Sequence, residues 1–220
     1  MIAISINPNL KELFPDAALG CIAFDVVVEP SNPALRQFAS VVIAEIQGEF
    51  ILETVSERPV IKATKEAYRL LGKDPSRYRP SAEALTRRVV SGKGIYEINN
   101  IVDILNLVSL RSGFSIGGYD YNKIVGDIEF GIGRKKEPYE AIGRGELNME
   151  NMPLFRDRMG AFGSPTSDSP RTMVTATTTG FLMVIIDFMG SDRFQPAIEE
   201  SISWMEKHGK AKLAKSWVVR

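Results

Sequence analysis

The segment GSPTSDSPRT, residues 163–172, concentrates side chains that could do chemistry. Ser167, Asp168, Arg171 and Thr172 supply two hydroxyls, a carboxylate and a guanidinium. Together such groups can hold a water, an ammonium and a ribose or phosphate oxygen. A turn dense in serine and proline is also typical of a solvated loop. The segment therefore leaves a binding site and an ordinary loop equally open.

A glycine pair precedes a second carboxylate. Gly117 and Gly118 come directly before Tyr119 and Asp120. The pair suits a tight turn that needs unusual backbone angles. It equally suits a stretch of backbone where side chains are omitted so that a ligand can approach.

Polar residues also gather near two expected helix starts. In the first, Ser81 can cap the helix and Glu83 is favoured by the positive end of the helix dipole, but neither effect accounts for Arg79. The second consists of asparagines and one aspartate on an otherwise apolar stretch: Asn99, Asn100, Asp103 and Asn106. Capping explains one asparagine, so a polar face toward a cavity and a buried hydrogen-bond network both remain open.

Cysteine and histidine each occur once. Cys21 lies in an apolar run and is expected to be a buried small hydrophobe. His208 comes at the end of a helical pattern and is expected on the surface. We therefore expect neither serine–histidine nor cysteine–histidine catalysis, and neither a metal nor a cofactor.

Length and composition fit one domain. The chain has 220 residues, of which 44% are hydrophobic and 25% charged, enough to bury a full core. No stretch has the length of a membrane span, and the first residues lack the pattern of a signal peptide. We expect a cytoplasmic protein with no membrane partner.

The net charge is zero but unevenly distributed. Residues 1–60 carry three Lys/Arg against eight Asp/Glu, whereas residues 61–140 carry fourteen against ten. A tight nonspecific nucleic-acid binder needs a larger basic excess, because phosphate neutralisation supplies most of its affinity. We expect no DNA partner, and any tRNA contact should be weak and local. The arginines expected to make it are Arg77, Arg79, Arg87 and Arg88.

Hydrophobic periodicity places helices early and strands late. Helices are expected after the Ser31-Asn32-Pro33 start, over 60–71, over 81–90, from about 100 to Gly113, and over 196–208. Strands are expected over 127–132, 145–149, 171–177 and 180–188. This order, without regular alternation, argues for an α+β domain.

Three motifs, RPSAEAL (79–85), INNIVDILN (98–106) and GFSIGGYD (113–120), resemble the B3/B4 domain of the phenylalanyl-tRNA synthetase beta subunit. That domain houses the site that hydrolyses wrongly charged tRNA. The resemblance runs over 79–187 and implies a single domain, 1–220, of mixed sheet with packed helices. Residues 1–78 would be an N-terminal extension of the same unit, and residues 190–220 a C-terminal helix and tail.

The chain departs from the family pattern at two positions. The editing histidine of the bacterial synthetase falls on Gly117, and a substrate-contacting glutamate falls on Pro165. The tyrosine-rejecting specificity of that site is therefore not carried over. Asn100, Asp103, Asn106 and Asp120 match retained positions. Ser167, Asp168, Arg171 and Thr172 resemble the pattern of free-standing members.

The resemblance implies a free-standing aminoacyl-tRNA deacylase that acts without a histidine. Asp168 would bind the substrate ammonium or orient a water, with Thr172 as a second catalytic candidate, and Arg171 would steady the terminal adenosine or its phosphate. The substrate would contact Asn100, Gly117, Gly118, Asp120, Ser167 and Arg171. A positioned water, oxyanion stabilisation and the neighbouring ribose hydroxyl suffice for such an ester.

Two other function classes remain open. One is a noncatalytic module that binds tRNA, an amino acid or a nucleotide, and the other is a small-molecule hydrolase. In each case the pocket is expected between residues 99–120 and 167–172.

Overall fold

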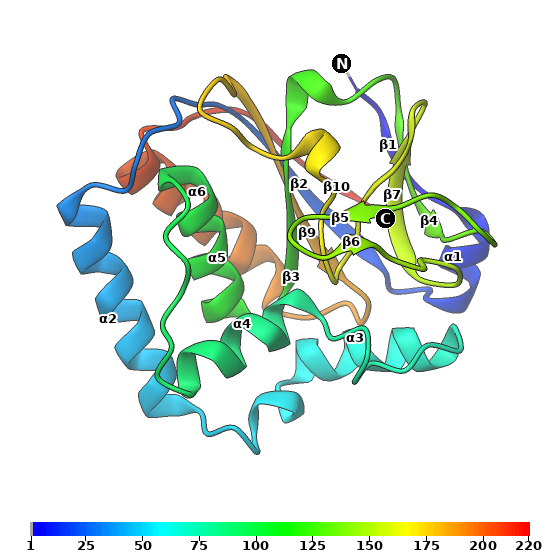
Figure 1. The fold of residues 1–220 in the computed structure, drawn as a ribbon, viewed down its shortest axis with the longest axis horizontal. Coiled ribbons are helices and arrows are strands. Elements are labelled where there is room, and N and C mark those ends of the chain that lie inside the picture. The colour runs from blue at the N-terminus through cyan, green and yellow to red at the C-terminus, as the bar shows by residue number, and fades with distance from the viewer. Residues whose placement is uncertain (1) are drawn as a thin grey trace.

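A four-stranded antiparallel sheet divides the molecule into two layers (Figure 1). In this computed structural model, which describes residues 2–220, its order is β10 (Lys212–Val219), β2 (Ala18–Asp25), β9 (Gly180–Asp187) and β3 (Ser115–Asp120). The central strands β2 and β9 are covered on both faces, which explains why each is an almost continuous apolar run rather than an alternating one. The predicted strand over 180–188 is thus confirmed.

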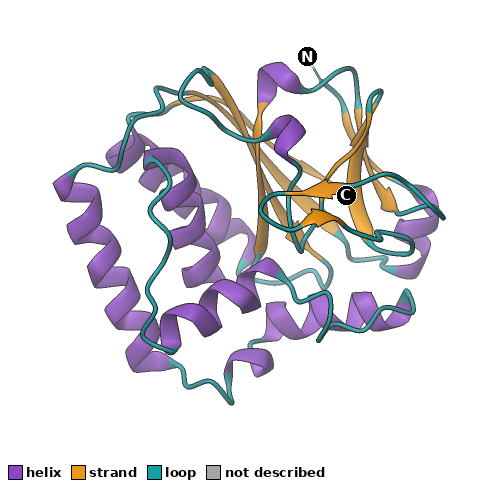
Figure 2. Cartoon of the chain, viewed as in Figure 1, coloured by secondary structure: helices purple, strands orange, loops and turns teal. Residues whose placement is uncertain are grey.

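Helices cover one face of this sheet (Figure 2). They are α2 (Pro33–Glu49), α4 (Ser81–Val90), α5 (Asn100–Ser112) and α6 (Phe194–Gly209). Buried Ile104 and Val108 of α5 belong to the same core as Ile22 and Met183 of the sheet. The fold class predicted from the sequence, α+β, is confirmed.

A second sheet packs on the other face. Its order is β1 (Ile4–Ile6), β4 (Ile128–Ile132), β7 (Pro153–Asp157) and β8 (Gly160–Gly163); β1 and β4 are parallel and the other pairs antiparallel. The core between the sheets is rich in phenylalanine rings that surround Tyr119. The short helix α1 (Pro8–Leu13) follows β1.

Short elements connect the layers. They are η1 (Val55–Glu57), α3 (Pro59–Leu70), η2 (Tyr121–Lys123), the β5–β6 hairpin (Glu140–Ala141 and Gly145–Glu146) and η3 (Pro170–Thr172). None of the helices formed by residues 2–220 is long and apolar enough to cross a membrane.

Helix caps confirm most of the expected helix ends. The side chain of Asn32 accepts from the N–H of Leu35, and that of Asn99 accepts from the N–H groups at the start of α5. Gly113 ends α5 in the left-handed region, with φ of 84°. Ser81 is not a cap, because it is the first residue of α4 and its N–H donates to the carbonyl of Pro165 at 2.8 Å.

Two predicted strands are wrong in extent or type. Residues 171–177 form the end of η3 and a loop, because Pro170 and the Ser169 side chain start a 3-10 turn that overrides the strand preference of threonine. Over 145–149 only Gly145–Glu146 is extended. The tail expected after the last helix is β10, an edge strand of the central sheet.

Candidate functional site

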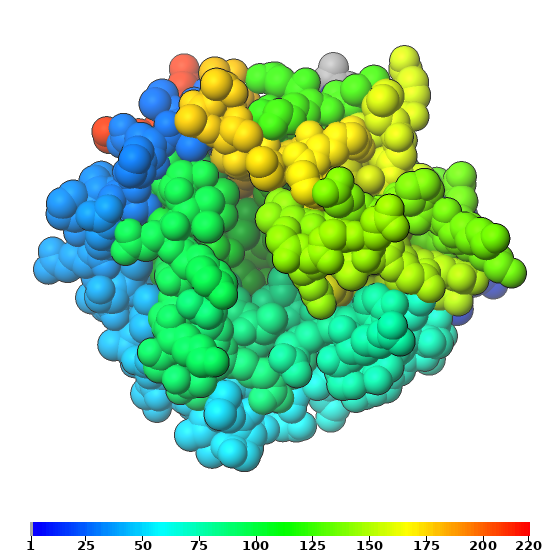
Figure 3. Space-filling model, in the orientation of Figure 1, coloured from blue at the N-terminus to red at the C-terminus, as the bar shows by residue number. Residues whose placement is uncertain are grey.

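A cavity of about 720 Å³ opens between α4, α5, β3 and the loop 164–168. Figure 3 shows this hollow between the green residues that lead into α5 and the yellow-green β5–β6 hairpin. Its apolar wall consists of Ala84, Leu85, Ile98, Val102, Leu105, Ile116, Ile142, Met173 and Val174. Its polar lining includes Asn106, Ser109, Ser164, Thr166, Ser167 and Asp168. The size is that of a pocket for a drug-sized or nucleotide-sized ligand.

Asp168 is the one acidic residue among the described residues that line this cavity. Its Oδ2 accepts a hydrogen bond from the N–H of Gly118 at 3.3 Å, and its Oδ1 accepts from the Tyr119 hydroxyl at 3.1 Å. Burial raises the pKa of Asp168 to about 7, although the N–H groups of Gly118 and Ser164 and the Tyr119 hydroxyl act in the opposite direction. The carboxyl can therefore take up and release a proton near neutral pH.

Tyr119 reaches Asp168 through a slot between two glycines. A Cβ added to Gly117 would lie 2.0 Å from the Tyr119 hydroxyl, and one added to Gly163 would lie 2.1 Å from it. Burial, followed by the negative charge of Asp168, raises the pKa of this phenol well above its usual range. Tyr119 therefore stays protonated and acts as a donor. Its hydroxyl occupies the space beside Gly117 that a larger side chain there would need.

The loop that carries Asp168 is fixed by hydrogen bonds within the loop and to neighbouring elements. The Ser164 hydroxyl accepts from the N–H groups of Thr166 and Ser167, at 3.2 and 3.1 Å. The Thr166 hydroxyl bonds the buried Tyr68 hydroxyl at 2.8 Å. The carbonyl of Asp168 accepts from the N–H of Ile142 at 2.9 Å. The carboxylate is thus presented by a loop that is ordered before any ligand binds.

Several polar side chains in the cavity lack partners among residues 2–220, and two of them lie on the elements that hold Asp168 and the facing wall. These two are the carboxamide of Asn106, on α5, and the hydroxyl of Ser167, beside Asp168. The other asparagines and acids of the polar cluster belong to a buried network instead. Asn100 bonds the N–H of Glu29 and the carbonyls of Val27 and Gly209, and Asp103 accepts from Ser31. The polar cluster thus does both things that the sequence left open: Asn106 faces the cavity, and Asn100 and Asp103 belong to a buried hydrogen-bond network.

Four arginines complete the lining and make the cavity cationic: Arg77, Arg79, Arg88 and Arg144. Arg144, on the β5–β6 hairpin, is exposed and forms no side-chain hydrogen bond or ion pair within the described chain. Anionic groups of a ligand would be neutralised here.

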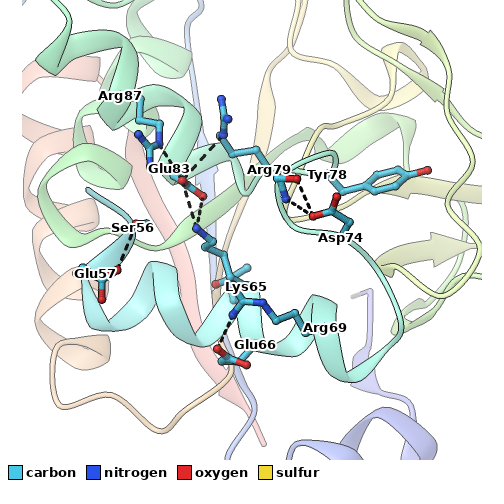
Figure 4. Close-up of polar contacts among 12 residues, drawn as sticks. Ser56, Glu57, Lys65, Glu66, Arg69, Asp74, Tyr78, Arg79, Glu83 and Arg87 are labelled. Carbon is cyan, nitrogen blue, oxygen red and sulfur yellow. Dashed lines mark hydrogen bonds and ion pairs between the residues drawn. The ribbon is translucent and has the colours of Figure 1, made fainter. Parts of the chain in front are cut away.

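The buried carboxylate of Glu83 forms ion pairs with three basic side chains beside the cavity. Figure 4 shows Lys65, Arg79 and Arg87 directed at Glu83, with N···O distances of 3.5, 4.0 and 2.8 Å. The Arg87 guanidinium also donates to the carbonyl of Leu52. Of the four arginines expected to contact RNA, Arg87 alone is outside the cavity lining, and its guanidinium is held by Glu83 and the carbonyl of Leu52.

The structure places five of the other expected site residues outside the cavity lining. Asn100 and Gly117 have the packing roles described above. The Asp120 carboxylate accepts from Thr178 at 2.7 Å. The Arg171 guanidinium makes two hydrogen bonds to Asp157, at 3.0 and 2.9 Å, and a third to the carbonyl of Gly160. The Thr172 side chain is fully buried. Three of the expected substrate-binding or catalytic residues do line the cavity, together with the arginines: Gly118, Ser167 and Asp168.

Sequence reasoning missed Tyr119 and Arg144 as members of the site and gave Asn106 no role in substrate contact. The glycines at 117 and 163 were the available signal for Tyr119, because small residues flank a side chain that must pass between them. Within residues 2–220 no three His, Cys, Asp or Glu side chains come together as a metal site.

Of three comparisons with known proteins, the family model shows the family of this chain. A comparison with curated proteins finds no match. Among solved structures, the chain is similar to an N-terminal fragment of the phenylalanyl-tRNA synthetase beta subunit from Pyrococcus horikoshii, with 13% sequence identity and a TM-score of 0.49. The similarity covers 99% of this chain and 50% of that one, so this chain spans about half the length of that fragment. The family model described as the B3/4 domain matches residues 63–207, which include the cavity from Ser76 to Val174. The chain therefore belongs to the B3/4 domain family.

Proposed function

We propose that this protein hydrolyses the ester bond of mischarged aminoacyl-tRNA. The observation that carries the proposal is Asp168, a carboxyl with a pKa of about 7 in a cavity whose remaining charged groups are arginines. The aminoacyl end of tRNA has the complementary charges, since it carries one ammonium beside the ester and phosphates beyond the ribose.

The hydrolysis needs few protein groups. Ionised Asp168 orients a water for attack on the ester carbonyl carbon and takes up its proton, or else holds the substrate ammonium while the ribose hydroxyl assists the water. The acyl–oxygen bond then breaks, and the ribose oxygen receives a proton. The carboxamide of Asn106 and the hydroxyl of Ser167 supply free donors for the carbonyl oxygen as it becomes negative.

The proposed contact with RNA is confined to the cavity mouth. Arg77, Arg79 and Arg144 are exposed there, whereas residues 1–60 are acidic. A few phosphate contacts give weak, salt-sensitive binding. We also propose that residues 1–220 act as one unit, because β2 and β10 complete the sheet on which the site is built.

The proposal is tested by deacylation of a panel of mischarged tRNAs by wild type, Asp168→Asn and the control Asp192→Asn. Asp192 is exposed and outside the cavity. Wild type and the control should release the amino acid from at least one tRNA, and Asp168→Asn should be at least about 100-fold slower, the usual scale for acid–base groups. Folded wild-type protein that hydrolyses no member of the panel contradicts the proposal.

A noncatalytic function is the second candidate, favoured by the absence of a histidine or cysteine from the described cavity lining. It predicts that wild type and Asp168→Asn both bind charged tRNA and that neither releases the amino acid. Hydrolysis of free amino acid esters without hydrolysis of charged tRNA would instead indicate a small-molecule hydrolase.

A further inference from the structure

An exposed tyrosine stands at the mouth of the cavity. Tyr96, in the loop between α4 and α5, is 62% exposed, and its neighbour Ile98 is 59% exposed. Both line the cavity that contains Asp168. Exposed aromatic and aliphatic side chains that border one cavity mark a surface that takes up a flat apolar group.

One face of the Tyr96 ring is already covered. The Cζ of Arg88 lies 3.7 Å from the ring centroid, and Arg88 Nη1 donates to the Tyr96 hydroxyl at 3.0 Å. This cation–π contact fixes the plane of the ring. The exposed area of Tyr96 consequently belongs to the opposite face and the edges, where a ligand can stack.

The loop on both sides of the ring is anchored. Arg88 holds Tyr96 itself, Glu97 pairs with Arg36 of α2 at 3.1 Å, and the N–H of Ile98 donates to buried Asp103 at 2.8 Å. An aromatic ring fixed in this way loses little conformational entropy when a second ring stacks on it.

We propose that Tyr96 is the stacking platform for the base of the ligand's terminal nucleotide, the adenine at the 3′ end of tRNA. The proposal rests on the proposed function and adds the recognition of the base. Proteins bind unpaired bases by stacking them on aromatic side chains, and arginine strengthens the contact. The cavity then holds an acid for the ammonium, arginines for phosphate and a ring for the base.

Nucleotide binding tests this without hydrolysis, by calorimetric titration with AMP and with ribose 5-phosphate, which lacks the base. Wild type should bind AMP about tenfold more tightly, the scale of one stacked base. Tyr96→Ala should lose that difference, Tyr96→Phe should keep it, and the control Leu70→Ala, exposed on α3 outside the cavity, should leave it unchanged.

Three results would overturn the proposal: no binding of AMP, equal affinity for AMP and ribose 5-phosphate, or unchanged AMP affinity in folded Tyr96→Ala. A CCA trinucleotide separates the two sources of the base. Tighter binding of CCA than of AMP supports the tRNA end, whereas equal or weaker binding excludes it in favour of a free nucleotide. Since no ester is present, these results are independent of whether the protein is a deacylase.

Discussion

The hydroxyl of Tyr119 donates to Oδ1 of Asp168 at 3.1 Å, and this pairing joins strand β3 to the loop that follows β8. The phenol reaches the carboxylate only because Gly117 and Gly163 carry no side chains on either side of it. The N–H of Gly118 holds the second carboxylate oxygen. A group suited to acid–base chemistry is thus positioned by one tyrosine and three glycines, without a histidine.

Replacing Gly163 by alanine should displace Tyr119. The new Cβ would lie 2.1 Å from the hydroxyl, so the ring or the strand must shift. Overpacking of this kind costs about 1–3 kcal/mol of unfolding free energy. We expect a lower melting temperature and a larger loss of deacylation than the stability change explains. The control Gly48→Ala, in α2 with open space around the Cβ, should be neutral or stabilising. Full activity per folded Gly163→Ala molecule would show that the Tyr119 position is irrelevant to the site.

Tyr119→Phe should shift the pH dependence of turnover. A hydrogen bond to the ionised carboxylate lowers its pKa, so its removal leaves the Asp168 pKa above its present value of about 7. Because the ionised form is the active one, the rate in wild type should rise through about pH 7, and in Tyr119→Phe the rise should move to higher pH. Rates are measured from pH 5 to 9 after subtraction of spontaneous ester hydrolysis. Identical profiles would exclude Tyr119 as the group that tunes Asp168.

The stability of the protein should also report the Asp168 pKa. Its ordinary value is about 3.9 and its folded value about 7, so between these pH values the folded state holds a proton that the unfolded state has released. The contribution of Asp168 to stability is therefore greatest at the acid end of this window and is lost as pH rises to 7. Asp168→Asn lacks this dependence. Unfolding in denaturant should show wild type losing stability relative to the mutant from pH 4.5 to 7.5; a constant difference would contradict the raised pKa.

The helical layer was predictable because its signals are local. Asn32 with Pro33 starts α2, and Asn99 with Gly113 limits α5, so the caps mark both helices whatever packs against them. Strand β3 was not predicted, since its sequence SIGGYD contains two glycines, which suited a tight turn or the close approach of a ligand. Those glycines are explained by contacts with Tyr119 and with Leu105 of α5. The glycines are visible in the sequence, but which side chains fill the space beside them depends on the fold.

The site was predictable to a similar degree. The resemblance indicated that the segments around Gly118 and Asp168 face each other, and they do meet through a hydrogen bond. The partner of Arg171 could not be inferred, because Asp157 lies on β7 and nothing in its local sequence distinguishes it from a surface carboxylate.

Charge reversal at Arg144 should weaken tRNA binding without affecting the fold. Its guanidinium is exposed at the cavity mouth and has no ion pair within residues 2–220. Arg144→Glu removes one phosphate contact and adds a repulsive charge, so affinity should fall and the slope of log Kd against log salt should become shallower. The control is Lys207→Glu, exposed on α6 outside the cavity. Equal effects of the two reversals would mean that binding follows the overall charge and not the cavity mouth.

Arg171→Lys separates a scaffold role from a substrate role. The guanidinium makes two hydrogen bonds to Asp157, whose side chain is fully buried, and a third to the carbonyl of Gly160. Lysine keeps the charge but cannot reproduce the parallel pair, which should cost about 1–3 kcal/mol of unfolding free energy. The exposed Arg69–Glu66 pair of α3 supplies a matched control, because Arg69→Lys should change stability by less than about 0.5 kcal/mol.

Melting temperature and deacylation are measured together on the same preparations. We expect Arg171→Lys to melt earlier and to keep its turnover per folded molecule, since its guanidinium is bound to protein rather than to the cavity. An unchanged melting temperature with lost turnover would instead place Arg171 against the substrate.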